Sequence, residues 1–108
     1  MKTRRDVFQA LADPTRRAII LLLTVGAMTP NAIAENFDSS RQAISKHLKV
    51  LTECEIVIQQ QVGREINYHL NAHKMKDIEQ WLEQFKQLIS KRFDQLDNVL
   101  EQLKNKPI

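Results

Sequence analysis

Residues 71–104 contain no glycine and no proline. Apolar side chains recur there at alternating steps of three and four, a period typical of one continuous helix with an apolar face. A helix over about residues 72–104 spans roughly 50 Å, more than a domain of this size covers. We therefore expect the face to form a homodimer interface. The expected interface residues are Ile78, Leu82, Phe85, Ile89, Leu96, Val99 and Leu103, and the series is interrupted by Arg92.

An alternative is a stretch that folds back as two shorter helices onto the chain's own core. It is disfavoured because no breaker residue is present at which the helix could end.

Composition predicts one small domain. The chain has 108 residues, 43% of them hydrophobic, and a net charge of +3, which tilts weakly towards an acidic partner. Cys54 is the single cysteine, so no internal disulfide is possible and a cytoplasmic location fits. The longest apolar run, residues 18–23, is too short to span a membrane, and the charged N-terminus leads into no signal-peptide core.

Residues 39–51 read as an amphipathic helix that extends to about residue 53. Ile44, Leu48 and Leu51 fall on one face. Ser39 or Ser40 can serve as the N-cap, and Ser39 with Gln42 has capping-box spacing. Within residues 39–51 the opposite face carries no acid, and its polar groups are of the kinds that contact bases and phosphates.

Three shorter helices are expected before it. Residues 3–12 form the first, and Asp13-Pro14 opens a second that runs to about Thr24 and, being apolar nearly all round, is expected to be buried. Arg16 and Arg17 at its start are expected to pair with Asp13 or another carboxylate or to reach a phosphate; pairing is favoured for one of them, and the other is left open. Thr29-Pro30 opens a third helix to about Asn36, which forms a helix-turn-helix with residues 39–53.

After Cys54 the period changes from 3.6 to 2. Residues 57–62 and 65–70 alternate in polarity around Gly63-Arg64, which predicts a two-stranded hairpin. A hairpin directly after such a helix is the wing of a winged helix. The predicted fold class is therefore mainly α with a two-stranded β-hairpin, a winged helix-turn-helix with a long C-terminal dimerisation helix.

The acid-free helix face and the wing together predict a protein that binds double-stranded DNA. Candidate base and near-base contacts are Arg41, Gln42, Ser45 and Lys46, and candidate phosphate or minor-groove contacts are Ser40, Lys49 and Arg64. The alternative from another class is a winged-helix protein–protein interaction module, in which the same surface meets an acidic protein. Steep salt dependence and preference for one palindromic duplex would separate the two.

Nothing in the sequence favours an enzyme, a cofactor or a metal site. No phosphate-binding glycine loop or nucleophile elbow is present. His47 is interpreted as a half-buried core histidine, with a base contact as the alternative. His69 and His73 lack a third ligand nearby, and Cys54 is interpreted as an apolar filler, with a redox role as the alternative.

Two segments resemble the ArsR/SmtB family of bacterial winged-helix repressors. Residues 8–19, FQALADPTRRAI, are similar to its N-terminal signature, and residues 40–51, SRQAISKHLKVL, to its recognition helix. Val62-Gly63-Arg64 and Tyr68-x-Leu70 also match. The resemblance implies a dimeric repressor that binds operator DNA and is released by a metal or another inducer, whose identity the sequence does not give.

The chain departs from the family pattern at three places. Residues 30–36 lack the cysteine pair of the metal-sensing members, and no histidine follows His73, so neither metal site carries over. The family usually has glycine where Glu55 stands, so this junction is expected to be built differently. Ser39 stands where the family usually has an apolar residue.

Overall fold

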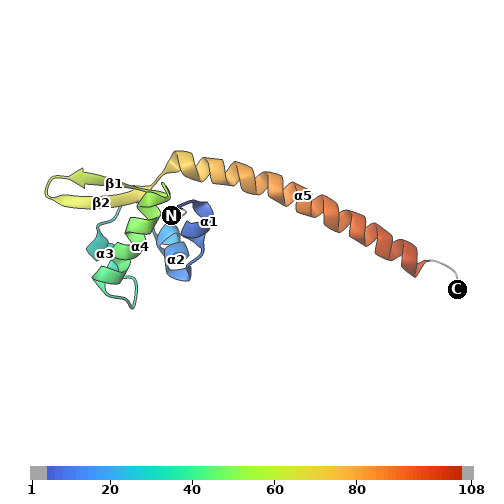
Figure 1. Cartoon of the computed structure of the whole chain (residues 1–108), viewed down its shortest axis with the longest axis horizontal. Coiled ribbons are helices and arrows are strands. Elements are labelled where there is room, and N and C mark those ends of the chain that lie inside the picture. The colour runs from blue at the N-terminus through green and yellow to red at the C-terminus, as the bar shows by residue number, and fades with distance from the viewer. Residues whose placement is uncertain (1–4, 106–108) are drawn as a thin grey trace. The chain divides into compact units, whose positions relative to one another are not determined.

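The computed structural model describes residues 5–105 of the chain. Its contacts divide the chain into two compact units, one ending at Met75 and the other starting at Lys76. The described residues form five helices and one hairpin, which confirms the predicted mainly α fold class with a long C-terminal helix (Figure 1). The elements are α1 (Val7–Leu11), α2 (Pro14–Leu22), α3 (Pro30–Ala34), α4 (Arg41–Glu53), β1 (Val57–Val62), β2 (Glu65–Leu70) and α5 (Ala72–Lys104).

The core of the first unit lies where α4 packs against both α2 and α3. In Figure 1, α4 lies between these two helices. The fully buried side chains there come from all three helices. They are Ile19 of α2, Ile33 of α3, and Ile44, Leu48 and Leu51 of α4. Burial of apolar surface at this junction fixes which face of α4 is left to solvent.

Local capping chemistry sets where the short helices begin. The side chains of Asp13 and Thr29 accept hydrogen bonds from the first turns of α2 and α3, each followed by proline at the first helical position. These two starts are as predicted. The first helix differs, because Asp6 caps it and α1 begins at Val7. Of the residues predicted before that point, Thr3 and residue 4 lie outside the described part.

The prediction that the second helix is buried at the centre of the fold is wrong for part of its surface. Ile19 and Leu23 are buried, but the Leu21 side chain is 70% exposed, and α2 ends at Leu22. The reason is geometric: α1 and α4 pack against α2, and the side of α2 that bears Leu21 stays open to solvent.

β1 and β2 pair antiparallel from Val57 opposite Leu70 to Val62 opposite Glu65. Gly63 in the two-residue turn has φ +64°, a conformation that favours glycine and suits a tight hairpin. Tyr68 of β2 also exchanges two backbone hydrogen bonds with Met28, the residue before the N-cap of α3. This bridge ties the hairpin to the start of the helix-turn-helix.

Glu55 ends α4 in a left-handed conformation, with φ +64°. The backbone N–H of Glu55 donates to Thr52 and that of Ile56 donates to Leu51, which is the Schellman pattern. Ile56 and Leu51 stand where this motif commonly has an apolar contact, and both are fully buried. The expectation that this junction is built differently from a glycine C-cap is therefore wrong, since the glutamate adopts the glycine-type geometry.

α5 is one unbroken helix, which rules out the fold-back alternative. The Asn71 side chain caps it by accepting from the Lys74 N–H. None of its residues is buried within the described chain, and the apolar side chains of Leu88 and Phe93 are 65% and 61% exposed. Within residues 5–105, no helix is long and apolar enough to cross a membrane.

Candidate nucleic-acid interface

The solvent face of α4 presents a continuous set of hydrogen-bond donors. The side chains predicted to contact DNA from this helix are all exposed: Arg41, Gln42, Ser45, Lys46 and Lys49. Their exposure follows from burial of the opposite face, where Ile44, Leu48 and Leu51 are inaccessible to solvent. A guanidinium, an amide, a hydroxyl and two ammonium groups on one face match both phosphates and base edges.

Ser40 is the N-cap of α4, and its hydroxyl oxygen accepts from the Ala43 N–H. The capping-box spacing of Ser39 with Gln42 is therefore not used. With Ser40 as the cap, Ala43 takes the third helical position, where it has no side-chain acceptor to return the bond. Gln42 is thus left with its amide in solvent.

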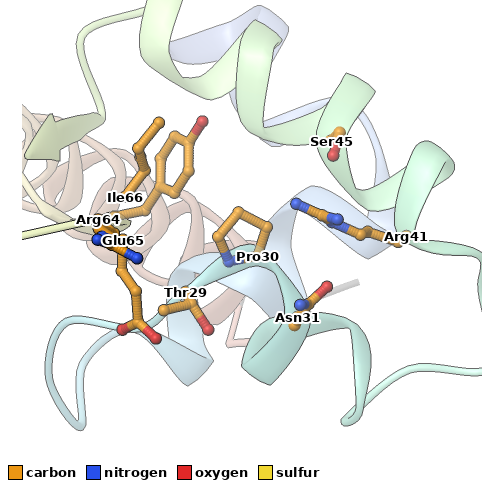
Figure 2. Close-up of a pocket in the computed structure, with 9 residues that line it drawn as sticks. Thr29, Pro30, Asn31, Arg41, Ser45, Arg64, Glu65 and Ile66 are labelled. Atoms are coloured by element: carbon orange, nitrogen blue, oxygen red, sulfur yellow. The ribbon is translucent and has the colours of Figure 1, made fainter. Parts of the chain in front are cut away.

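A cavity of about 390 Å³ lies between the start of α3, the start of α4 and the hairpin. Figure 2 shows Arg41 and Ser45 reaching into it from α4, towards Pro30 and Asn31. The hairpin side contributes Arg64 and Glu65. The full lining consists of Thr29, Pro30, Asn31, Arg41, Ser45, Arg64, Glu65, Ile66 and Tyr68.

The structure brings together only part of the predicted contact set. Arg41, Ser45 and Arg64 share the cavity, whereas Gln42, Lys46 and Lys49 lie on α4 outside its lining. Sequence reasoning missed Thr29, Asn31 and Tyr68. Their placement depends on the packing of α3 and on the bridge between Met28 and Tyr68, and an isolated bridge leaves no periodic signal in a sequence.

Behind α4, His47 is half-buried and faces α2. Its Nε2 lies 3.9 Å from an Asp13 carboxylate oxygen, and its Nδ1 lies 3.4 Å from Nη1 of Arg16. Burial raises the pKa of Asp13. Hydrogen bonds from the backbone N–H groups of Arg16 and Thr15 lower it, as do the charges of His47 and Arg16, and the net pKa falls below its usual value. The His47 imidazole therefore lies between α4 and α2, as expected for a half-buried core histidine.

Arg16 and Arg17 donate hydrogen bonds to carbonyl oxygens, and the Arg16 charge also acts on the Asp13 carboxylate, whose pKa it lowers. Arg16 donates to the carbonyls of Gln9 and Ala10, and Arg17 donates to that of Leu11. These carbonyls lie at the C-terminal end of α1, which carries the negative end of the helix dipole. The two guanidiniums thus attach α1 to α2.

At the far end of α4, Glu53 forms an ion pair with Arg5. The hydrogen bond from the Arg5 side chain lowers the pKa of Glu53, and the charges of Arg5 and Lys49 lower it as well. Cys54 beside it is buried, and burial raises the pKa of its thiol. Across residues 5–105, no three His, Cys, Asp or Glu side chains are grouped so that they could hold a metal ion.

Residues 11–60 match a family model described as a helix-turn-helix domain. The chain is 41% identical over 80 residues to the transcriptional repressor SdpR of Bacillus subtilis, which covers 74% of this chain and 89% of that protein. It is 34% identical over 69 residues to the arsenical resistance operon repressor of Escherichia coli, which covers 63% of this chain and 59% of that protein.

Solved structures agree with these relatives. An ArsR-like transcriptional regulator from Rhodococcus sp. RHA1 superimposes with a TM-score of 0.70 at 32% identity, over 86% of this chain and 88% of that one. A possible transcriptional regulator for arsenical resistance gives a TM-score of 0.67 at 35% identity, over 80% of this chain and 95% of that one. The sequence signature, the winged helix-turn-helix and these similarities agree, and the chain belongs to the ArsR/SmtB family of winged-helix transcriptional regulators, which are DNA-binding proteins and not enzymes.

Proposed function

We propose that this regulator is a sequence-specific repressor that acts as a homodimer on a palindromic operator, and therefore works in the cytoplasm with the DNA. The observation that carries the proposal is the exposed face of α4 from Arg41 to Lys49, which holds no acid, beside a hairpin that carries Arg64. Each α4 would enter a major groove, with half-sites one helical turn apart or a multiple of it. Repression rather than activation is supported by the relatives that are named repressors.

The two elements would contribute different kinds of binding energy. The Gln42 amide, exposed in the first turn of α4, can pair with adenine through two hydrogen bonds, a contact worth roughly 1–3 kcal/mol of discrimination. Lys46 and Ser45 lie one turn further along the same face. Arg64 at the hairpin turn is suited to a phosphate or the minor groove, which contributes affinity but little sequence information.

Dimerisation is supported by α5. Its apolar face holds the residues expected at an interface, and none of them is buried within the described chain. These side chains are Ile78, Leu82, Phe85, Ile89, Leu96, Val99 and Leu103. A contiguous apolar face of this length on a small protein is typical of an association surface.

The test is selection of duplexes from a random pool with the purified full-length protein, followed by binding measurements over a range of salt. We expect one enriched palindromic sequence, bound more tightly than random DNA, with affinity that falls steeply as salt rises. Failure to enrich any sequence, with weak binding at low salt, would contradict the proposal and favour the protein-interaction alternative.

Two substitutions then separate the roles. Gln42→Ala should weaken binding to the selected duplex and leave random-duplex binding nearly unchanged. Arg64→Ala should weaken both to a similar degree and reduce the salt slope by about one unit. Gln84→Ala on α5 is the matched control and should change neither. If Gln42→Ala lowered the affinity for both duplexes equally, the exposed face of α4 would contact phosphates only.

A further inference from the structure

The cavity between α3, α4 and the hairpin contains more binding chemistry than the predicted contacts use. Its lining includes two guanidiniums against one carboxylate, so it favours an anion. It also includes three hydroxyls and one side-chain amide, from Thr29, Ser45, Tyr68 and Asn31. We propose that this cavity seats one phosphodiester of the DNA backbone, with Thr29 and Asn31 as phosphate-binding residues and Arg41 as a phosphate rather than a base contact.

The Thr29 hydroxyl can serve two roles at once. Its oxygen accepts the Ala32 N–H at 3.2 Å to cap α3, and a hydroxyl retains a proton to donate. Asn31 is exposed two residues further along, and its amide adds two donors. Both residues therefore present donors on the α3 side of the cavity.

Arg41 and Arg64 supply the charge from the other sides. Figure 2 shows the Arg41 guanidinium directed across the cavity towards Pro30 rather than along the outer face of α4. A side chain held in this direction meets a backbone phosphate more readily than a base edge. Base recognition then falls to Gln42 and its neighbours outside the cavity.

Position in the fold makes the site rigid. The Thr29 end of α3 is fixed to the hairpin by the two hydrogen bonds between Met28 and Tyr68, of 3.0 and 2.8 Å. The α4 side is fixed by burial of Ile44 beneath it. A phosphate bound here would set the register of α4 in the groove, because three elements contact it simultaneously.

Glu65 is the one acid in the lining. Its substitution is a useful test because the expected result is tighter binding, which a misfolded variant would not show. A carboxylate beside a bound phosphate is repulsive, so Glu65→Gln should tighten binding to both the selected and the random duplex by about threefold to tenfold. Glu83→Gln on α5 removes the same charge far from the cavity in sequence and should change affinity less than twofold. Equal gains for both variants would overturn the proposal.

The decisive experiment pairs a protein variant with a modified duplex, and it rests on the proposed DNA binding. Neutral methylphosphonates replace the phosphates of the selected duplex one at a time. With the wild-type protein, one position per half-site should cost roughly tenfold in affinity, the factor for a lost hydrogen bond to a charged group. With the Thr29→Val, Asn31→Ala variant, the same replacement should cost less than it does in the wild type, because only the bonds to Arg41 and Arg64 are then left to lose, while other positions cost what they did before.

Each outcome has one meaning. Wild-type binding without any coupling between the variant and a particular phosphate refutes the phosphate seat and leaves the proposed function intact. No binding of wild-type protein to any duplex refutes the proposed function itself. Inorganic phosphate distinguishes a free anion from the backbone: at matched ionic strength it should compete no better than chloride, and stronger competition would assign the cavity to a soluble phosphate and overturn the proposal.

Discussion

Glu55 holds a backbone conformation that costs an ordinary side chain roughly 1–2 kcal/mol. It does so because the Schellman bonds to Thr52 and Leu51 require a left-handed residue at this place. Its carboxylate lies 3.7 Å from the Lys74 ammonium, but the Glu55 side chain is largely exposed, and such pairs contribute little. The strain is therefore only weakly offset.

Glu55→Gly should raise the free energy of unfolding by up to about 1 kcal/mol, because glycine adopts positive φ without a steric cost. Denaturant titration with an unchanged m-value would measure the gain. Glu55→Ala is the control, since it removes the carboxylate and keeps the strain. An equal gain for alanine would show that the carboxylate, and not the backbone, is unfavourable.

The lowered pKa of Asp13 predicts how the free energy of unfolding depends on pH. Burial raises its pKa, but backbone donors of Arg16 and Thr15, and the charges of His47 and Arg16 that face it, bring the net value below the ordinary 3.8. An acid whose folded pKa is lowered contributes stability that is complete above its unfolded pKa and is lost as pH falls through the folded one. The contribution should therefore be present at neutral pH and disappear in acid.

Asp13→Asn and Asp13→Ser both keep an N-cap acceptor and remove the charge. Each variant should be less stable than wild type at neutral pH, and the difference should shrink as pH falls below 3.8. Urea unfolding across that pH range measures it. If either variant keeps the same deficit at the lowest pH, the carboxylate charge is not its source.

At the scale of elements, α1 depends on two side chains of α2. Arg16 is half-buried and donates to two α1 carbonyls, whereas Arg17 is exposed and donates to one. Arg16→Met should lower the free energy of unfolding by about 1–3 kcal/mol, and Arg17→Met by less because solvent weakens its bond. Thermal and denaturant unfolding provide the comparison.

Arg64→Met is the matched control for these two changes. It should leave stability unchanged and weaken DNA binding, the reverse of Arg16→Met measured under conditions where both proteins are folded. If Arg16→Met kept full stability and lost DNA affinity, its guanidinium would contact a phosphate after all.

Most elements could be predicted from the sequence because their signals are local. Asp13-Pro14 and Thr29-Pro30 each carry a cap and a pre-set φ, and the change to period 2 after Cys54 marks the hairpin. The errors concern partners rather than elements. The carbonyl partners of Arg16, the exposure of Leu21 and the position of Tyr68 in the cavity lining depend on tertiary packing, which local patterns do not encode.

At the scale of the whole molecule, α5 has more apolar surface than the described chain covers. Across the described residues of α5, even the series predicted to be buried in a dimer is accessible, and Leu96 and Val99 are each about half exposed. A second copy would bury this face through helix–helix packing. Arg92 interrupts the series. In a dimer its aliphatic carbons would pack at the interface, and its guanidinium would have to extend outward to stay in solvent.

The Leu96→Asp, Val99→Asp variant of the full chain should be monomeric at low micromolar concentration and should lose affinity for the selected duplex. Two carboxylates would otherwise be buried at the interface without partners. Gln87→Asp, Ser90→Asp is the control: it adds the same residues at the same spacing to the opposite face and should stay dimeric. Arg92→Leu should shift the equilibrium towards dimer, because it completes the apolar series. Sedimentation equilibrium measures all three, and a Leu96→Asp, Val99→Asp protein that remains dimeric would place the interface on another surface.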